Sequence, residues 1–130
     1  MKNIVAIILA AGKGLRMKSS IPKVLHKLCG RPLIDYSIIL ARQLSIKRVI
    51  TVIGHNHKMV RGYLRGKSEV VRQKKLSGTA DAVLTTKGKL GDFQGDILVI
   101  CGDVPLLRPS TVRRLIARHR KTKADCRERV

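Results

Sequence analysis

Aromatic and acidic residues are scarce in this sequence. Its 130 residues include two tyrosines, one phenylalanine and no tryptophan, and only eight Asp or Glu stand against 28 Lys or Arg, for a formal net charge of +20. The lack of aromatic rings argues against proteins that read single-stranded nucleic acid by stacking bases on aromatic side chains. The excess of cations suits partners that are rich in phosphate.

Cysteines and long hydrophobic runs are also few. Cys29, Cys101 and Cys126 are odd in number and widely spaced, which fits neither a disulfide framework nor a zinc site. The longest uncharged apolar run, residues 4–12, is about half of what a membrane span requires, and no secretory cleavage site follows it. We therefore expect a reduced, cytoplasmic protein without a membrane segment.

Hydrophobic residues make up 44% of the chain, enough for the core of one folded domain. Residues 4–11 are apolar at every position, which predicts a strand buried on both faces of a parallel sheet. Similar but shorter runs predict strands over 48–53, 69–71 and 96–101. Helical spacing predicts helices over 33–44 with Pro32 in the first turn, over 79–86, and over 109–121. This alternation predicts an α/β fold with right-handed crossovers.

The segment after the first strand is rich in glycine and cations. A buried strand that ends in Gly12-Lys13-Gly14 places backbone N–H groups at the carboxyl edge of the sheet, where phosphates bind. Four cations lie within eleven residues: Lys13, Arg16, Lys18 and Lys23. The spacing fits neither a Walker A loop nor the dinucleotide fingerprint, which needs glycine where Met17 stands. A polyphosphate loop and a solvated basic loop both stay open on composition alone.

Three segments resemble sugar-nucleotide pyrophosphorylases. They are residues 9–32, which hold this loop and Pro22-Lys23, residues 73–82 (Gln-Lys-Lys-Leu-Ser-Gly-Thr-Ala-Asp-Ala) and residues 101–106 (Cys-Gly-Asp-Val-Pro-Leu). Together they are most similar to the uridylyltransferase half of the bifunctional UDP-N-acetylglucosamine pyrophosphorylase/glucosamine-1-phosphate N-acetyltransferase family. The chain departs from that family's pattern at Ser77. It also departs at Cys101, because an aromatic residue is more usual at that position.

The resemblance implies a Rossmann-like, three-layer nucleotidyltransferase fold of the MobA-like kind, with an incomplete, mostly parallel sheet of about four strands in the order 3-2-1-4. It implies that UTP and N-acetylglucosamine 1-phosphate give UDP-N-acetylglucosamine and diphosphate, with Mg²⁺ as cofactor. Arg16 and Lys23 would be catalytic, and Asp103 would bind the metal. The nucleotide would be held by Leu9, Ala10, Ala11, Gly12, Gly14, Lys23, Gln73, Gly78 and Thr79.

The strand order has two consequences. It would bring the loops after the first and fourth strands side by side at the topological switch point, so that Gly12-Lys13-Gly14 faces Gly102-Asp103. Taken alone, the Gly-Asp pair is better explained as a turn, and the companion segments favour the metal-binding interpretation. The order would also leave the apolar strand 96–101 at the edge of the sheet, which predicts self-association.

Other chemically suggestive residues have plainer explanations. His55 and His57 have no further metal ligand nearby in sequence and are expected in a polar loop after the second strand. His119 continues an apolar helical stripe and is expected at the boundary of the core. Cys101 is expected to be buried in its strand and inert.

Residues 1–126 are interpreted as the N-terminal part of a nucleotidyltransferase domain, and residues 127–130 as a charged tail outside the resemblance. In the family the catalytic domain is considerably longer, and its second half supplies the sugar-phosphate pocket. We therefore expect this chain to bind nucleotide but to be catalytically impaired. The alternative is a basic nucleic-acid-binding module without enzymatic activity; it is disfavoured because the cations are scattered along the sequence and no reader motif is present.

Overall fold

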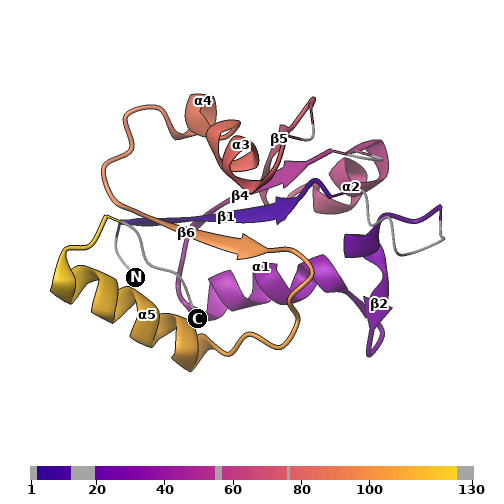
Figure 1. Ribbon diagram of the computed structural model, residues 1–130. Coiled ribbons are helices and arrows are strands. Elements are labelled where there is room, and N and C mark those ends of the chain that lie inside the picture. The colour runs from indigo at the N-terminus through magenta and orange to yellow at the C-terminus, as the bar shows by residue number, and fades with distance from the viewer. Residues whose placement is uncertain (1–2, 13–19, 55–56, 76, 126–130) are drawn as a thin grey trace.

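A parallel sheet of four strands forms the centre of the protein in a computed structural model that describes residues 3–12, 20–54, 57–75 and 77–125. The strands are β1 (Ile4–Ala10), β4 (Arg48–Ile53), β5 (Glu69–Arg72) and β6 (Asp96–Cys101). They lie in the order β5-β4-β1-β6, with all arrowheads toward one edge (Figure 1). This confirms the predicted order 3-2-1-4. In the register, Ile7 lies opposite Ile50 and Val99.

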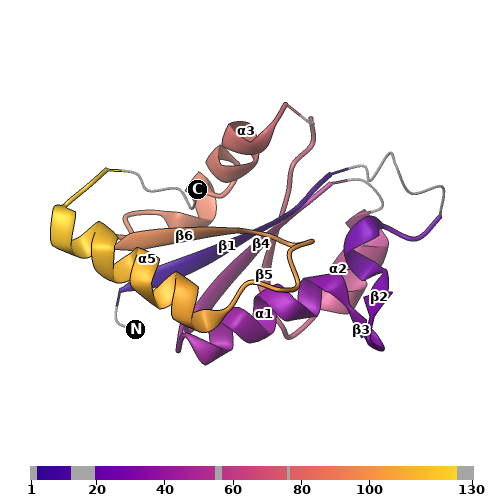
Figure 2. The ribbon, with the colours of Figure 1, turned by 60° about the horizontal axis from the view of Figure 1, so that its bottom comes forward.

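Helices cover both faces of the sheet and make it three-layered. The apolar stripes of α1 (Leu33–Gln43), α2 (His57–Leu64) and α5 (Pro109–Thr122) join one core cluster, which includes Ile8 and Ile34. On the other face of the sheet lie α3 (Thr79–Leu84) and α4 (Lys87–Leu90) (Figure 1 and Figure 2). They contribute to a smaller cluster around Ile7 and Val52. β1 is buried on both sides because both layers meet on it. None of the described helices is long and apolar enough to cross a membrane.

The edge strand β6 is covered on one face only. Leu98 and Ile100 face the large cluster, whereas Ile97 and Val99 on the opposite face are 45% and 42% exposed. Cys101 shares this second face and is also exposed. The prediction that Cys101 is buried is therefore wrong: the small cluster on that face contains no residue of β6 among those described.

A hairpin that the sequence patterns did not predict precedes α1. β2 (Lys27–Leu28) pairs antiparallel with β3 (Arg31–Pro32), so Pro32 ends a strand and is not in the first turn of the helix. The turn residues Cys29 and Gly30 have positive φ angles of 52° and 75°. Tight hairpins with such turns are usually signalled by Asn-Gly or Asp-Gly, and the Cys-Gly pair concealed this one.

Two helical predictions also need correction. The helix expected over 79–86 ends earlier, at Leu84 as α3, and a separate helix, α4, begins at Lys87. Between them lies Thr86, whose buried hydroxyl donates to the carbonyl oxygen of Val83 at 2.7 Å. Such local side-chain hydrogen bonds compete with a continuous helix. His57 does not lie in a polar loop but begins α2, whose Val60 and Leu64 are buried one turn apart. His55 lies outside the described residues.

Candidate functional site

The segments that follow β1 and β6 meet at an ion pair. The Nζ atom of Lys23 lies 2.8 Å from Oδ2 of Asp103, although 80 residues separate them. Lys23 begins the short 3-10 helix η1 (Lys23–Leu25), and Asp103 follows the carboxyl end of β6. Both side chains are partly exposed. The strand order thus brings the chain after β1 and the end of β6 together at the switch point. The predicted facing of Gly12-Lys13-Gly14 and Gly102-Asp103 stays a prediction, because Lys13 and Gly14 lie outside the described residues.

Gly102 allows the end of β6 to approach β1 closely. Its N–H donates to the carbonyl oxygen of Leu9 at 2.8 Å. A Cβ atom at Gly102 would lie 3.1 Å from that oxygen and 3.4 Å from the side chain of Val24. Because Gly102 has no side chain, the backbone just before Asp103 can lie close to the carboxyl end of β1.

Ser37 holds the end of β6 from the helical layer. Its side chain in α1 is fully buried, and its Oγ donates to the carbonyl oxygen of Cys101 at 3.1 Å. This bond satisfies a backbone acceptor just before Gly102 and Asp103. Ser37 lies in the helix that the sequence predicts over 33–44, but this role of its hydroxyl was not predicted. A hydroxyl at an otherwise apolar helical position was the available signal.

The turn of η1 directs Lys23 outward. Val24 is 7% exposed and belongs to the large core cluster. Successive side chains of a 3-10 helix point in directions about 120° apart, so burying Val24 leaves Lys23 on the solvent side. Backbone bonds from Leu25 N–H to Pro22 and from His26 N–H to Lys23, at 2.9 and 3.0 Å, close the turn.

Gln73 links β5 to the start of α3. Its N–H donates to the carbonyl oxygen of Ile53 at 2.8 Å, and its side chain is 4% exposed. The Nε2 atom donates to Oδ2 of Asp81 at 2.9 Å and to the carbonyl oxygen of Gly78 at 3.4 Å. Gln73 therefore joins the end of β5 directly to Gly78 and to Asp81 at the start of α3. The part of Asp81 in this link was missed at the sequence level, although the residue lies in the segment that carries the resemblance.

The same segment is anchored over β1. Ala82 of α3 packs with Ile7 and Ala11 in the smaller core cluster. Gly78, with a φ of +95°, precedes the helix, and Thr79 begins it with an exposed side chain. The site residues predicted after β1 and after β5 are thus carried by elements that pack together.

The predicted site residues at the end of β1 and just after it differ in their exposure to solvent. Leu9 is half-buried, Ala10 and Ala11 are buried, and Gly12 is exposed. Because buried alanines offer little but backbone, a ligand at Ala10 or Ala11 would meet N–H and C=O groups. Gly14 and Arg16 lie outside the described residues, as do Lys13 and Lys18.

The described part of the site offers a metal ion chiefly oxygen ligands, such as the carboxylate of Asp103. Among the described residues, no three His, Cys, Asp or Glu side chains come together as metal ligands. A cation at Asp103 would complete its shell with water or phosphate oxygens, as Mg²⁺ commonly does. Desolvation, and secondarily the charge of Asp103, raises the pKa of the Cys101 thiol. A raised pKa favours the protonated thiol, which is the less reactive form; the predicted inertness of Cys101 stays a prediction.

Comparison with known proteins also indicates a nucleotidyltransferase domain. The chain matches the MobA-like NTP transferase domain over residues 6–127. It is 43% identical over 119 residues to the bifunctional protein GlmU of Listeria monocytogenes, covering 92% of this chain and 26% of that protein. Identity to the bifunctional protein GlmU of Geobacter sulfurreducens is 41% over 126 residues, with coverage of 95% and 26%. The chain thus spans about a quarter of the length of these relatives.

The fold agrees with a solved enzyme structure. A nucleotidyl transferase from Methanothermobacter thermautotroptrophicus is similar with a TM-score of 0.73 and 27% sequence identity, over 90% of this chain and 58% of that one. The family match covers almost the whole chain, and the four-stranded parallel sheet with its three layers is the Rossmann-like arrangement expected of it. On these grounds the chain belongs to the MobA-like NTP transferase domain family.

Proposed function

We propose that this chain forms the nucleotide-binding part of a uridylyltransferase that acts on UTP and N-acetylglucosamine 1-phosphate. The observation that carries the proposal is the Lys23–Asp103 pair, with its 2.8 Å contact at the carboxyl edge of the sheet. Open α/β sheets bind their ligands at this edge, next to the switch point. The GlmU relatives and the three resembling segments favour the uracil nucleotide and the amino-sugar phosphate.

In the proposed reaction, a phosphate oxygen of the sugar 1-phosphate attacks the α-phosphorus of UTP. The bond from that phosphorus to the bridging oxygen of the β-phosphate breaks, and diphosphate leaves. Such transfers depend on charge neutralisation and in-line positioning more than on proton transfer. Lys23 would contact the transferring phosphate, and Arg16 the triphosphate. Mg²⁺, when bound at Asp103, neutralises charge on the phosphate oxygens.

The uracil would be held mainly by backbone at the end of β1. Support comes from α3, which packs on β1 through Ala82, and from the Gln73–Asp81 bond, which holds the segment before α3 in place. The residues proposed for the nucleotide pocket are Leu9, Ala10, Ala11, Gly12, Gly14, Lys23, Gln73, Gly78 and Thr79.

The division into a domain part over 1–126 and a tail over 127–130 belongs to the same proposal. The chain spans 26% of the length of its GlmU relatives. We therefore expect it to bind nucleotide without efficient turnover. A reduced, cytoplasmic setting also belongs to the proposal, in keeping with Cys29 and Cys101 as free thiols.

Calorimetry with UTP and Mg²⁺ tests the binding proposal. We expect saturable heat with UTP and weaker heat with CTP under the same conditions. Release of diphosphate from UTP and N-acetylglucosamine 1-phosphate should stay far below about 1 per second, the low end of ordinary enzyme rates. A folded protein that gives no heat with UTP contradicts the binding proposal. Release at an ordinary enzyme rate contradicts the expected impairment.

We further propose that β6 pairs with a second copy of this chain. Among the described strands β6 pairs with β1 on one side and none on the other, and Ile97 and Val99 on its open face are exposed. Edge strands with apolar side chains readily pair with another chain. The net charge of +20 opposes this at low salt, and screening with a Debye length of about 8 Å at physiological ionic strength weakens the opposition.

Replacing Val99 by lysine should reduce self-association. Light scattering of the unmodified chain should show an apparent mass that rises with salt, and Val99→Lys should keep it near that of a monomer because a charge on the open face disfavours pairing. Leu106→Lys is the matched control: it adds the same charge at an apolar residue that is 84% exposed outside the sheet. Equal effects of both substitutions, or a monomer at all salt concentrations, would contradict the proposal.

A further inference from the structure

The outer face of α5 gathers cations without any acidic residue. Five of its 14 residues are Arg or Lys, and none is Asp or Glu. Helical periodicity places Val112 and Ile116 in the core and turns Arg114, Arg118 and Lys121 to the solvent. These three cations, which we call the α5 basic row, span about 10 Å along the helix axis.

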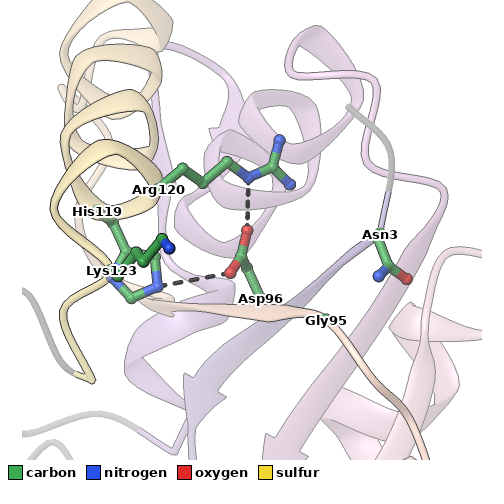
Figure 3. A pocket seen from close by; sticks show the side chains of 6 residues that line it. All are labelled: Asn3, Gly95, Asp96, His119, Arg120 and Lys123. Atoms are coloured by element: carbon green, nitrogen blue, oxygen red, sulfur yellow. Dashed lines mark hydrogen bonds and ion pairs between the residues drawn. The ribbon is translucent and has the colours of Figure 1, made fainter.

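Contacts on the inner side fix the direction of this row. Near the C-terminal end, Asp96 accepts a 2.6 Å hydrogen bond from Nε of Arg120 and lies 3.4 Å from Nε2 of His119 (Figure 3). Near the N-terminal end, Arg113 donates to the carbonyl oxygen of Gln43 in α1 at 2.8 Å. These contacts link both ends of α5 to neighbouring elements and leave the basic row facing the solvent.

No carboxylate compensates the α5 basic row in the part of the chain that the structure describes. The ion pairs there do not involve Arg114, Arg118 or Lys121. Most carboxylates already have partners elsewhere: Asp35, Glu69, Asp81, Asp96 and Asp103. An uncompensated row of cations on a protein with a net charge of +20 attracts polyanions.

We propose that the α5 basic row binds the phosphate backbone of double-stranded nucleic acid without reading its sequence. A row of cations at regular helical spacing suits the regular phosphates of a duplex. Helix α5 contains no aromatic residue on which unpaired bases could stack. It also has no exposed large apolar side chain, which insertion into a lipid surface would need.

Arg118 and Lys121, in the C-terminal half of α5, lie toward the end of β6 that is opposite the proposed nucleotide site. The C-terminal half of α5 lies near Asp96, which begins β6, whereas Asp103 follows the other end of that strand. Failure of UTP binding would therefore leave the inference about α5 intact, and the reverse also holds.

Fluorescence anisotropy of a short labelled DNA duplex, measured over a series of salt concentrations, tests the proposal. The variant R114Q/R118Q/K121Q should weaken binding at low salt by about tenfold or more and lower the slope of log Kd against log salt by about three. The matched control K58Q/R61Q/R65Q removes the same charge from exposed positions on and just after α2. It should change the affinity less than threefold.

Each outcome is decisive. A selective loss in the α5 variant, with UTP binding and the circular dichroism spectrum unchanged, supports the proposal. Equal losses in both variants would show that net charge alone attracts the duplex and would overturn it. Binding of the unmodified chain to vesicles of phosphatidylcholine and phosphatidylserine that exceeds duplex binding, and that the α5 variant loses, would overturn it in favour of a membrane surface.

Discussion

Lys23→Ala is expected to weaken the binding of UTP with Mg²⁺ by about 10- to 150-fold, because charge-assisted hydrogen bonds contribute about 1.5–3 kcal/mol each. The substitution removes the cation that is held at the carboxyl edge of the sheet, and it leaves Asp103 without the ammonium group 2.8 Å away. Calorimetry of the two proteins in the same buffer measures the difference.

Lys27→Ala is the matched control. Lys27 is an exposed lysine of the adjacent hairpin and takes part in none of the described ion pairs, so its loss should change UTP affinity less than twofold. Arg16→Ala, at a position outside the described residues, is expected to act like Lys23→Ala. Equal UTP affinities of Lys23→Ala and the unmodified protein would contradict the proposed function, because it rests on the Lys23–Asp103 pair.

Asp103→Asn separates the two roles of the pair. With Mg²⁺ it should weaken UTP binding, since a metal ligand is lost. Without Mg²⁺ it should leave the affinity unchanged or increase it, since a negative charge near the phosphates is lost. Weaker binding by the same factor in both conditions would show that Asp103 acts only by holding the local structure.

Gly95→Ala is expected to destabilise the fold by about 1–3 kcal/mol, the usual cost of forcing extra atoms into a packed site. A Cβ atom there would lie 2.4 Å from the carbonyl oxygen of Asn3 and 2.6 Å from the ring of Phe93. The same carbonyl oxygen accepts the N–H of Asp96 at 3.0 Å, where the pairing of β1 and β6 begins. Relief of the clash would therefore disturb this pairing.

Gly88→Ala is the control for that change. Gly88 lies in α4, its φ is not positive, and a Cβ atom there meets nothing within 4 Å. Alanine should leave the free energy of unfolding unchanged or raise it by up to about 1 kcal/mol, because glycine is the less favourable residue within a helix. Urea unfolding followed by circular dichroism measures both variants. A cost below about 0.5 kcal/mol for Gly95→Ala, within the ordinary effect of surface changes, would show that the β1–β6 junction relaxes easily.

The positions of the main strands could be read from the sequence because their signals are local. Continuous apolar runs identified β1, β4 and β6, and the run at 48–53 agrees with the bounds of β4. Their order followed from the resemblance of the three segments and is confirmed. The hairpin of β2 and β3 escaped notice because its turn uses Cys29-Gly30, a pair that composition does not distinguish from a loop.

The overall distribution of the cations along the sequence says less about them than their helical spacing within 109–121, which already groups several of them opposite an apolar face. They are dispersed along the sequence, and this dispersal argued against a binding surface for nucleic acid. In the folded chain, helical periodicity and the burial of Val112 and Ile116 place Arg114, Arg118 and Lys121 on one exposed face. Residues three or four apart on a helix are neighbours, whatever their distribution along the rest of the chain.

By itself, the sequence determined the fold class, the membership of the three segments in one family pattern and the residues worth testing, because hydrophobic periodicity and short motifs are properties of neighbouring residues. Only the tertiary structure decided that Lys23 meets Asp103, that Gln73 donates to Asp81, that Ser37 holds the end of β6 and that Cys101 is exposed. These facts depend on which elements pack together and which faces stay uncovered. Such long-range packing is set by the whole core, and no local pattern carries it.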